Sequence, residues 1–143
     1  MRALLDVNVL IALLDAGHAH HRHATDWLAA NLDHGWASCP ITQNGCVRIM
    51  SQPGYPMPLP AGEVAARLTE AAADASHEFW PDAVSLLEAG RFAWGRLLGP
   101  RQVTDAYLLA LAVEYGGRFV TFDQRIALQA VPAAKRRHCV VLV

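Results

Sequence analysis

The sequence has few cysteines, a single lysine, little charge and no long hydrophobic run. Its three cysteines, Cys39, Cys46 and Cys139, are odd in number and widely spaced, which excludes a disulfide framework and gives no zinc site. Charged residues make up 17% and hydrophobic residues 53%, a balance that favours a compact globule over a disordered chain. No stretch is long enough to span a bilayer, and Asp6 and Asn8 interrupt the apolar N-terminal run that a signal peptide would need. We therefore expect a cytoplasmic protein with reduced thiols and no contact with a membrane.

Short apolar segments alternate with helical patterns along the chain, which predicts an α/β fold. We expect a single domain over residues 1–143, with a mostly parallel central sheet of about five short strands flanked by helices. The expected strands are 3–7, 35–39, 77–80, 118–122 and 139–143. The expected helices are 9–15, a second one opened by residues 18–23, 42–50 with Thr42 as its cap, 64–72, a short one over 92–98, and 104–113.

Three aspartates occupy equivalent places in this pattern. Asp6 and Asp123 each follow a buried strand, and Asp105 lies in the first turn of the most apolar helix. Each has a structural alternative, because Asp6 and Asp105 can cap helices and Asp123 can form a turn. In a parallel sheet, however, strand carboxyl ends and helix amino ends share one edge, so the three can converge.

Three converging carboxylates would repel one another unless a cation neutralised them. Oxygen ligands select hard ions such as Mg²⁺ or Mn²⁺, which activate water for attack on phosphorus. Metal-dependent hydrolysis of a phosphodiester is the natural reaction. A phosphatase with Asp6 as covalent nucleophile is a weaker alternative, since the chain lacks a second aspartate at position 8 and a convincing catalytic lysine.

For two other segments we prefer a structural interpretation over a functional one. The histidines at positions 18, 20, 21 and 23 are more typical of a solvated surface than of a metal site. The proline-rich segment 52–60 is more typical of a rigid crossover between helices than of a docking surface for a partner.

Four motifs in order resemble the PIN domain, and within it the VapC toxins of toxin–antitoxin systems. They are Asp6-Val7-Asn8, the segment Pro40 to Gly45, the segment Gln102 to Ala110, and Thr121-Phe122-Asp123. The resemblance covers essentially the whole chain. It implies the toxin of a type II toxin–antitoxin system, a Mg²⁺- or Mn²⁺-dependent endoribonuclease that cleaves tRNA or rRNA. It also implies inhibition by a cognate VapB-like antitoxin and a homodimer.

The resemblance further implies roles for particular residues. Asp6, Asp105 and Asp123 would be the catalytic, metal-binding acids, and Asn8 and Thr121 would support them. Where the family usually has a glutamate at the start of the third helix, this chain has Gln43, which offers a carbonyl oxygen but removes a negative charge. A PIN-fold module that binds antitoxin or RNA without cleaving therefore stays open as an alternative.

Phosphate contacts need a local basic patch, because the net charge is −1. Eleven of the twelve basic residues are arginine, which binds phosphate in a bidentate manner. Lys135-Arg136-Arg137 is the one basic cluster and a candidate for RNA binding, although such runs are usually solvated. Isolated candidates are Arg91, Arg96, Arg101, Arg118 and Arg125.

Overall fold

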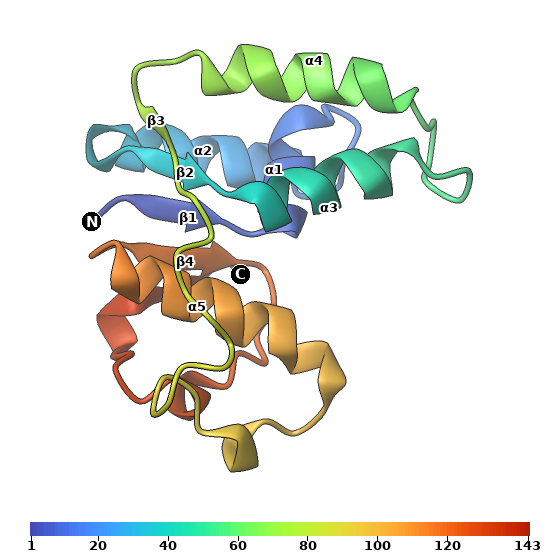
Figure 1. Ribbon diagram of the computed structural model, residues 1–143. Helices are drawn as coiled ribbons and strands as arrows, with labels where there is room; N and C mark the ends of the chain where they lie inside the picture. Colours follow the sequence, from blue (N-terminus) through green and yellow to red (C-terminus); the bar gives the residue numbers. More distant parts are fainter.

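A five-stranded sheet runs through the centre of the molecule in the computed structural model, which describes residues 1–143 (Figure 1). The strand order is β3-β2-β1-β4-β5, and every neighbouring pair is parallel. The strands are β1 (Ala3–Leu5), β2 (Trp36–Ser38), β3 (His77–Phe79), β4 (Arg118–Thr121) and β5 (Cys139–Val141). The predicted α/β class with a parallel sheet is confirmed.

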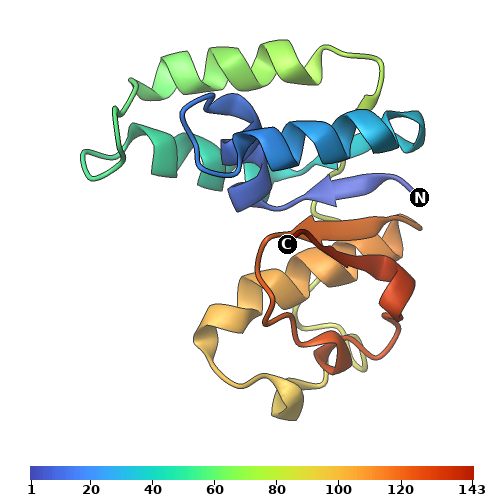
Figure 2. The same cartoon turned by 180° about the vertical axis from the view of Figure 1, so that it is seen from behind.

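Helices cover both faces of the sheet, with α1 to α4 on one face and α5 on the other (Figures 1 and 2). The strand β1 shows how the two layers arise, because its side chains alternate between the faces. Leu5 is buried with α1 to α4, whereas Leu4 is buried with α5. The helices are α1 (Val7–Leu14), α2 (His21–Asn31), α3 (Pro40–Ser51), α4 (Ala61–Ala72) and α5 (Val103–Glu114).

The helix α5 is buried on nearly all sides, as its sequence predicted. Seven consecutive residues, from Ala106 to Ala112, are buried. The helix ends before Gly116, whose φ of 66° suits a glycine at the end of a helix. This rigid, central position fixes where the first turn of α5, with Asp105, meets the sheet.

Several element boundaries differ from the predictions. The expected helix over 92–98 is only a 3-10 turn at Trp94–Arg96, because Gly95 lies inside the segment and Gly99-Pro100 follows it. The helix α3 begins at Pro40, and Thr42 accepts a hydrogen bond from the Cys39 backbone N–H at 3.0 Å from within its first turn.

Other features agree with the sequence. All three cysteines are free. The proline-rich segment joins α3 to α4, and its Tyr55 hydroxyl donates a hydrogen bond to Asp15 just after α1. None of the helices has the length and apolar character needed to cross a bilayer.

Candidate active site

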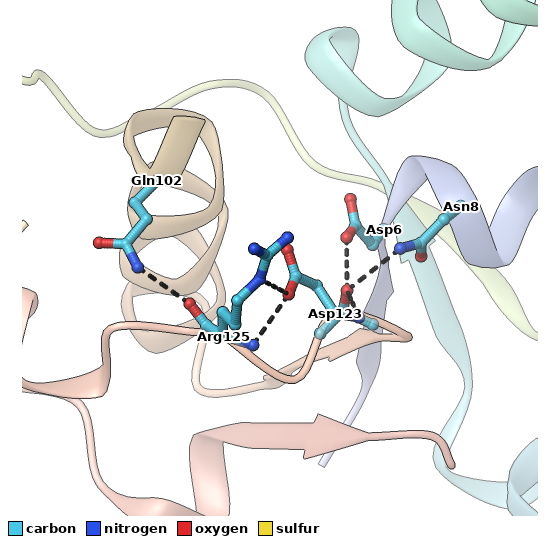
Figure 3. A network of polar contacts seen from close by, with 6 residues as sticks. Asp6, Asn8, Gln102, Asp123 and Arg125 are labelled. Atoms are coloured by element: carbon cyan, nitrogen blue, oxygen red, sulfur yellow. Dashed lines mark hydrogen bonds and ion pairs between the residues drawn. The ribbon is translucent and has the colours of Figure 1, made fainter. Parts of the chain in front are cut away.

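The three predicted acids lie at the carboxyl edge of the sheet, as the topology requires. Asp6 follows β1 and is only 8% exposed, and Asp123 follows β4 by two residues. Asp105 reaches the same edge from the first turn of α5. Figure 3 shows Asp6 and Asp123 on adjacent segments, with Asn8 beside them.

The buried hydroxyl of Thr121 organises the polar contacts between these segments. It donates a hydrogen bond of 2.6 Å to Oδ2 of Asp6 and accepts one of 3.0 Å from the backbone N–H of Asp123. The side-chain amide of Asn8 contacts the same hydroxyl at 3.5 Å. Thr121 and Asn8, two of the three residues predicted to support the acids, therefore belong to the polar contacts that link Asp6 to the segment of Asp123.

Asp6 also caps α1, which is the structural role that the sequence left open for it. Only one of its two carboxylate oxygens serves as the cap. Its Oδ1 accepts a hydrogen bond of 2.8 Å from the backbone N–H of Val7. A helix cap needs only one oxygen and no burial among other acids. Capping therefore leaves the position of Asp6 beside Asp123 unexplained.

The acids carry negative charge that nothing buried nearby offsets. Burial, with added repulsion from Asp6 and Asp123, raises the pKa of Asp105 from 3.8 to about 7. Burial also raises the pKa of Asp6, against the lowering effect of its hydrogen bonds to Thr121 and Val7, and repulsion from Asp123 adds to the rise.

The nearest basic group is a weak counter-ion. The guanidinium Nε of Arg125 lies 3.7 Å from Oδ1 of Asp123, and its side chain is 84% exposed to solvent. An exposed pair of this kind contributes little.

The donor set fits a hard divalent cation better than a zinc ion, because every candidate ligand is an oxygen. No three His, Cys, Asp or Glu side chains in the structure are grouped tightly enough to ligate one ion together. Direct ligation by all three acids would therefore require their carboxylates to move closer together. Mg²⁺ usually keeps several waters, so ligation through water by one acid also fits this arrangement.

Two open cavities flank the acids. The α3-side cavity, about 490 Å³, is lined by Asp6, Val7, Pro40, Ile41, Asn44, Gly45, Arg48, Ile49 and Thr104. The α5-side cavity, about 380 Å³, is lined by Leu98, Gly99, Pro100, Arg101, Gln102, Asp105, Asp123 and Arg125. These volumes are in the range of ligand sites in proteins.

Gln43 lines neither of the two cavities beside the acids. Its amide donates a hydrogen bond of 3.0 Å to Ser38, and its side chain lines a groove between α3 and α4. The α3 residues with polar side chains that share a cavity with Asp6 are Asn44 and Arg48, which we did not single out from the sequence. Their i, i+4 spacing puts both on one helical face and was the available signal.

The basic cluster Lys135-Arg136-Arg137 lies at the opposite edge of the sheet. It directly precedes β5, whose first residue, Cys139, pairs with Phe119 near the start of β4. The acids follow the ends of β1 and β4 instead. The cluster therefore lies at the amino ends of the strands, whereas the acids lie at the carboxyl ends. The predicted histidine surface lies nearer the acids, with His20 stacked on Phe122 at 5.0 Å between ring centroids.

Comparison with known proteins places the chain in a family. Residues 3–132 match the PIN domain family. The chain is 54% identical over 142 residues to the ribonuclease VapC44 of Mycobacterium tuberculosis (strain H37Rv), covering 99% of this chain and 100% of that protein. It is 44% identical over 128 residues to the ribonuclease VapC39 of the same strain, covering 89% and 92%.

Two solved structures share the fold at low sequence identity. The M. tuberculosis toxin VapC20, described as cleaving the sarcin–ricin loop, superposes with a TM-score of 0.61 at 15% identity, covering 90% of this chain and 95% of that one. The VapBC2 complex of Rickettsia felis, bound to DNA from its promoter, gives a TM-score of 0.56 at 14% identity, covering 94% and 96%. The 54% identity to VapC44 extends over nearly the whole chain, and the parallel sheet has the acidic edge described above. The chain therefore belongs to the PIN-domain VapC ribonuclease toxins.

Proposed function

We propose that this ribonuclease cuts RNA by metal-dependent hydrolysis at the edge formed by Asp6, Asp105 and Asp123. The carrying observation is that the three carboxylates, from distant parts of the chain, lie at one edge of the sheet without a buried counter-ion, and that burial raises the pKa values of Asp6 and Asp105. The whole of residues 1–143 would act as one nuclease domain. Mg²⁺ is the expected ion and Mn²⁺ the alternative.

The side chains have separate tasks in this proposal. Asp6, Asp105 and Asp123 would hold the cation, and the Thr121 hydroxyl fixes one oxygen of Asp6 while Asn8 steadies that hydroxyl. Such an ion would supply Lewis acidity, which favours ionisation of a water and stabilises charge on the leaving oxygen. Asp105 would give up its proton once positive charge is present beside it, because burial and then repulsion from Asp6 and Asp123 raise its pKa, and a cation would oppose both effects.

The relatives suggest partners as well. We propose that a VapB-like antitoxin binds and inhibits this chain, as the VapBC2 complex of R. felis suggests. Structured tRNA or rRNA is the proposed substrate class, in keeping with the description of VapC20 as cleaving the sarcin–ricin loop. A homodimer is the proposed assembly, and light scattering of the purified protein would test it.

The decisive experiment compares RNA cleavage by the wild type, Asp6→Asn and Asp26→Asn. Asp26 is an exposed aspartate on α2, away from the acidic edge, and is the matched control. We expect cleavage in Mg²⁺ by the wild type and the control, and none in EDTA or with Asp6→Asn. Cleavage in EDTA, or full activity of Asp6→Asn, would contradict the proposal. RNA binding by the wild type without cleavage in Mg²⁺ or Mn²⁺ would favour a binding module instead.

A further inference from the structure

The α3-side cavity carries a positive charge beside Asp6. Arg48 is exposed and follows Asn44 by one helical turn, and its guanidinium group makes no hydrogen bond or ion pair. Gly45 allows this placement, because a Cβ at that position would lie 2.7 Å from Cγ2 of Val7. The α3 backbone therefore packs directly on the first turn of α1, and its exposed face borders the acid.

The α5-side cavity carries a second unpaired arginine, Arg101, in the turn that leads into α5. The wall of this cavity is fixed by Gln102, whose side chain bridges two loops. Figure 3 shows its contact with Arg125. Its Oε1 accepts a hydrogen bond of 2.8 Å from the backbone N–H of Leu98. Its Nε2 donates one of 3.1 Å to the carbonyl of Arg125. The loop after Asp123 and the loop before α5 are thereby tied together.

An RNA strand that reaches the acids needs positive charge close to its path. The chain has a net charge of −1, and the acidic edge itself repels phosphates. Three other arginines are engaged elsewhere: Arg2 with Glu78, Arg91 with Glu114, and Arg118 with Asn31. Arg125 lines the α5-side cavity but is paired with Asp123. The remaining arginines, other than Arg48 and Arg101, line neither of the two cavities. Arg48 and Arg101, in contrast, have free guanidinium groups in the two cavities that flank the acids.

We propose that a single RNA strand crosses the acidic edge from the α3-side cavity to the α5-side cavity, with Arg48 and Arg101 binding phosphates on opposite sides of the bond that is cut. We call this path of the RNA from Arg48 to Arg101 the track. It rests on the proposed function, which places the bond that is cut at the acids. Gln102 acts as a positioning residue that holds the wall of the α5-side cavity. The basic cluster before β5 lies outside the track.

Binding of a labelled single-stranded RNA, measured by fluorescence anisotropy over a range of salt concentrations in EDTA, tests the track without requiring cleavage. We expect Arg48→Ala and Arg101→Ala each to weaken binding about 5- to 10-fold, the loss of one charge-assisted contact. Each should also reduce the slope of log K against log salt by about 0.7. Arg48→Lys should keep the wild-type slope because it keeps the charge.

Arg67→Ala is the matched control, because Arg67 is exposed on α4 and lines neither cavity. It should bind RNA as the wild type does. If Arg48→Ala binds like Arg67→Ala, or if Arg136→Ala causes the larger loss, the track is wrong. Absence of salt-dependent RNA binding by the wild type would also overturn it.

Cleavage kinetics separate the track from the proposed chemistry. In Mg²⁺, Arg48→Ala and Gln102→Ala should raise KM for RNA with little change in kcat, and the Mg²⁺ dependence should stay as in the wild type. Metal-dependent cleavage with an unchanged KM in Arg48→Ala would refute the track alone. Arginine-dependent RNA binding without metal-dependent cleavage would refute the proposed function alone.

Discussion

Replacing Asp105 by asparagine should make the metal-free protein more stable at alkaline pH. The folded protein holds the pKa of this carboxyl at about 7, whereas its ordinary value is 3.8. Between these pH values the folded state binds more protons than the unfolded state does. The free energy of unfolding of the wild type therefore falls as pH rises from about 4 to about 7, and stays lower above that window.

The size of the effect follows from the same values. A rise from 3.8 to about 7 corresponds to at most about 4 kcal/mol. Asp105 is only half-buried, so solvent screening reduces the expected gain from Asp105→Asn to about 1–2 kcal/mol. For a chain of this length that gain corresponds to a rise in Tm of about 3–8 °C.

Differential scanning calorimetry in EDTA at pH 4 and pH 8 would measure this difference in Tm between Asp105→Asn and the wild type. Asp105→Asn should melt higher than the wild type at pH 8 and close to it at pH 4, while the exposed Asp26→Asn should match the wild type at both. Added Mg²⁺ should then raise the Tm of the wild type more than that of Asp105→Asn. If Asp105→Asn is no more stable than the wild type at pH 8 in EDTA, the acidic edge is not electrostatically strained and the reasoning fails.

Three further substitutions probe the surroundings of the site. Gln43→Glu removes the donor to Ser38 and should cost about 1–2 kcal/mol in urea denaturation without increasing Mg²⁺-dependent cleavage; a large increase would show that position 43 reaches the acids after all. Gly45→Ala should destabilise the protein by about 1–3 kcal/mol, because the added Cβ would collide with the side chain of Val7. The double variant Gly45→Ala, Val7→Ala should regain much of that stability, and purely additive losses would argue against the contact. Thr121→Val removes a buried hydroxyl and should lower both stability, by about 1–3 kcal/mol, and cleavage rate, so wild-type values of both would exclude its supporting role.

The elements that carry the acids were predictable because the signals lie within short segments. The apolar segment before Asp6 predicts a strand, and the apolar pattern after Asp105 predicts a buried helix. The parallel topology then brings the carboxyl end of the strand and the amino end of the helix to one edge of the sheet. The expected helix over 92–98 was wrong, because Gly95 interrupts it and Gly99-Pro100 follows it. Its apolar pattern reflects instead the packing of Phe92 in the core with α5.

The sequence by itself determined the order of strands and helices, the parallel sheet and the three aspartates at its edge. Tertiary structure alone decided that Asn44 and Arg48, and not Gln43, border Asp6, and that the basic cluster before β5 lies at the far edge. The physical reason is that neighbouring residues on a helix point about 100° apart, so packing against another element decides which of them faces a site. Here that packing is the contact of Gly45 with α1, which links residues far apart in the chain; the i, i+4 spacing of Asn44 and Arg48 shows that they share a face of α3 but not what that face meets.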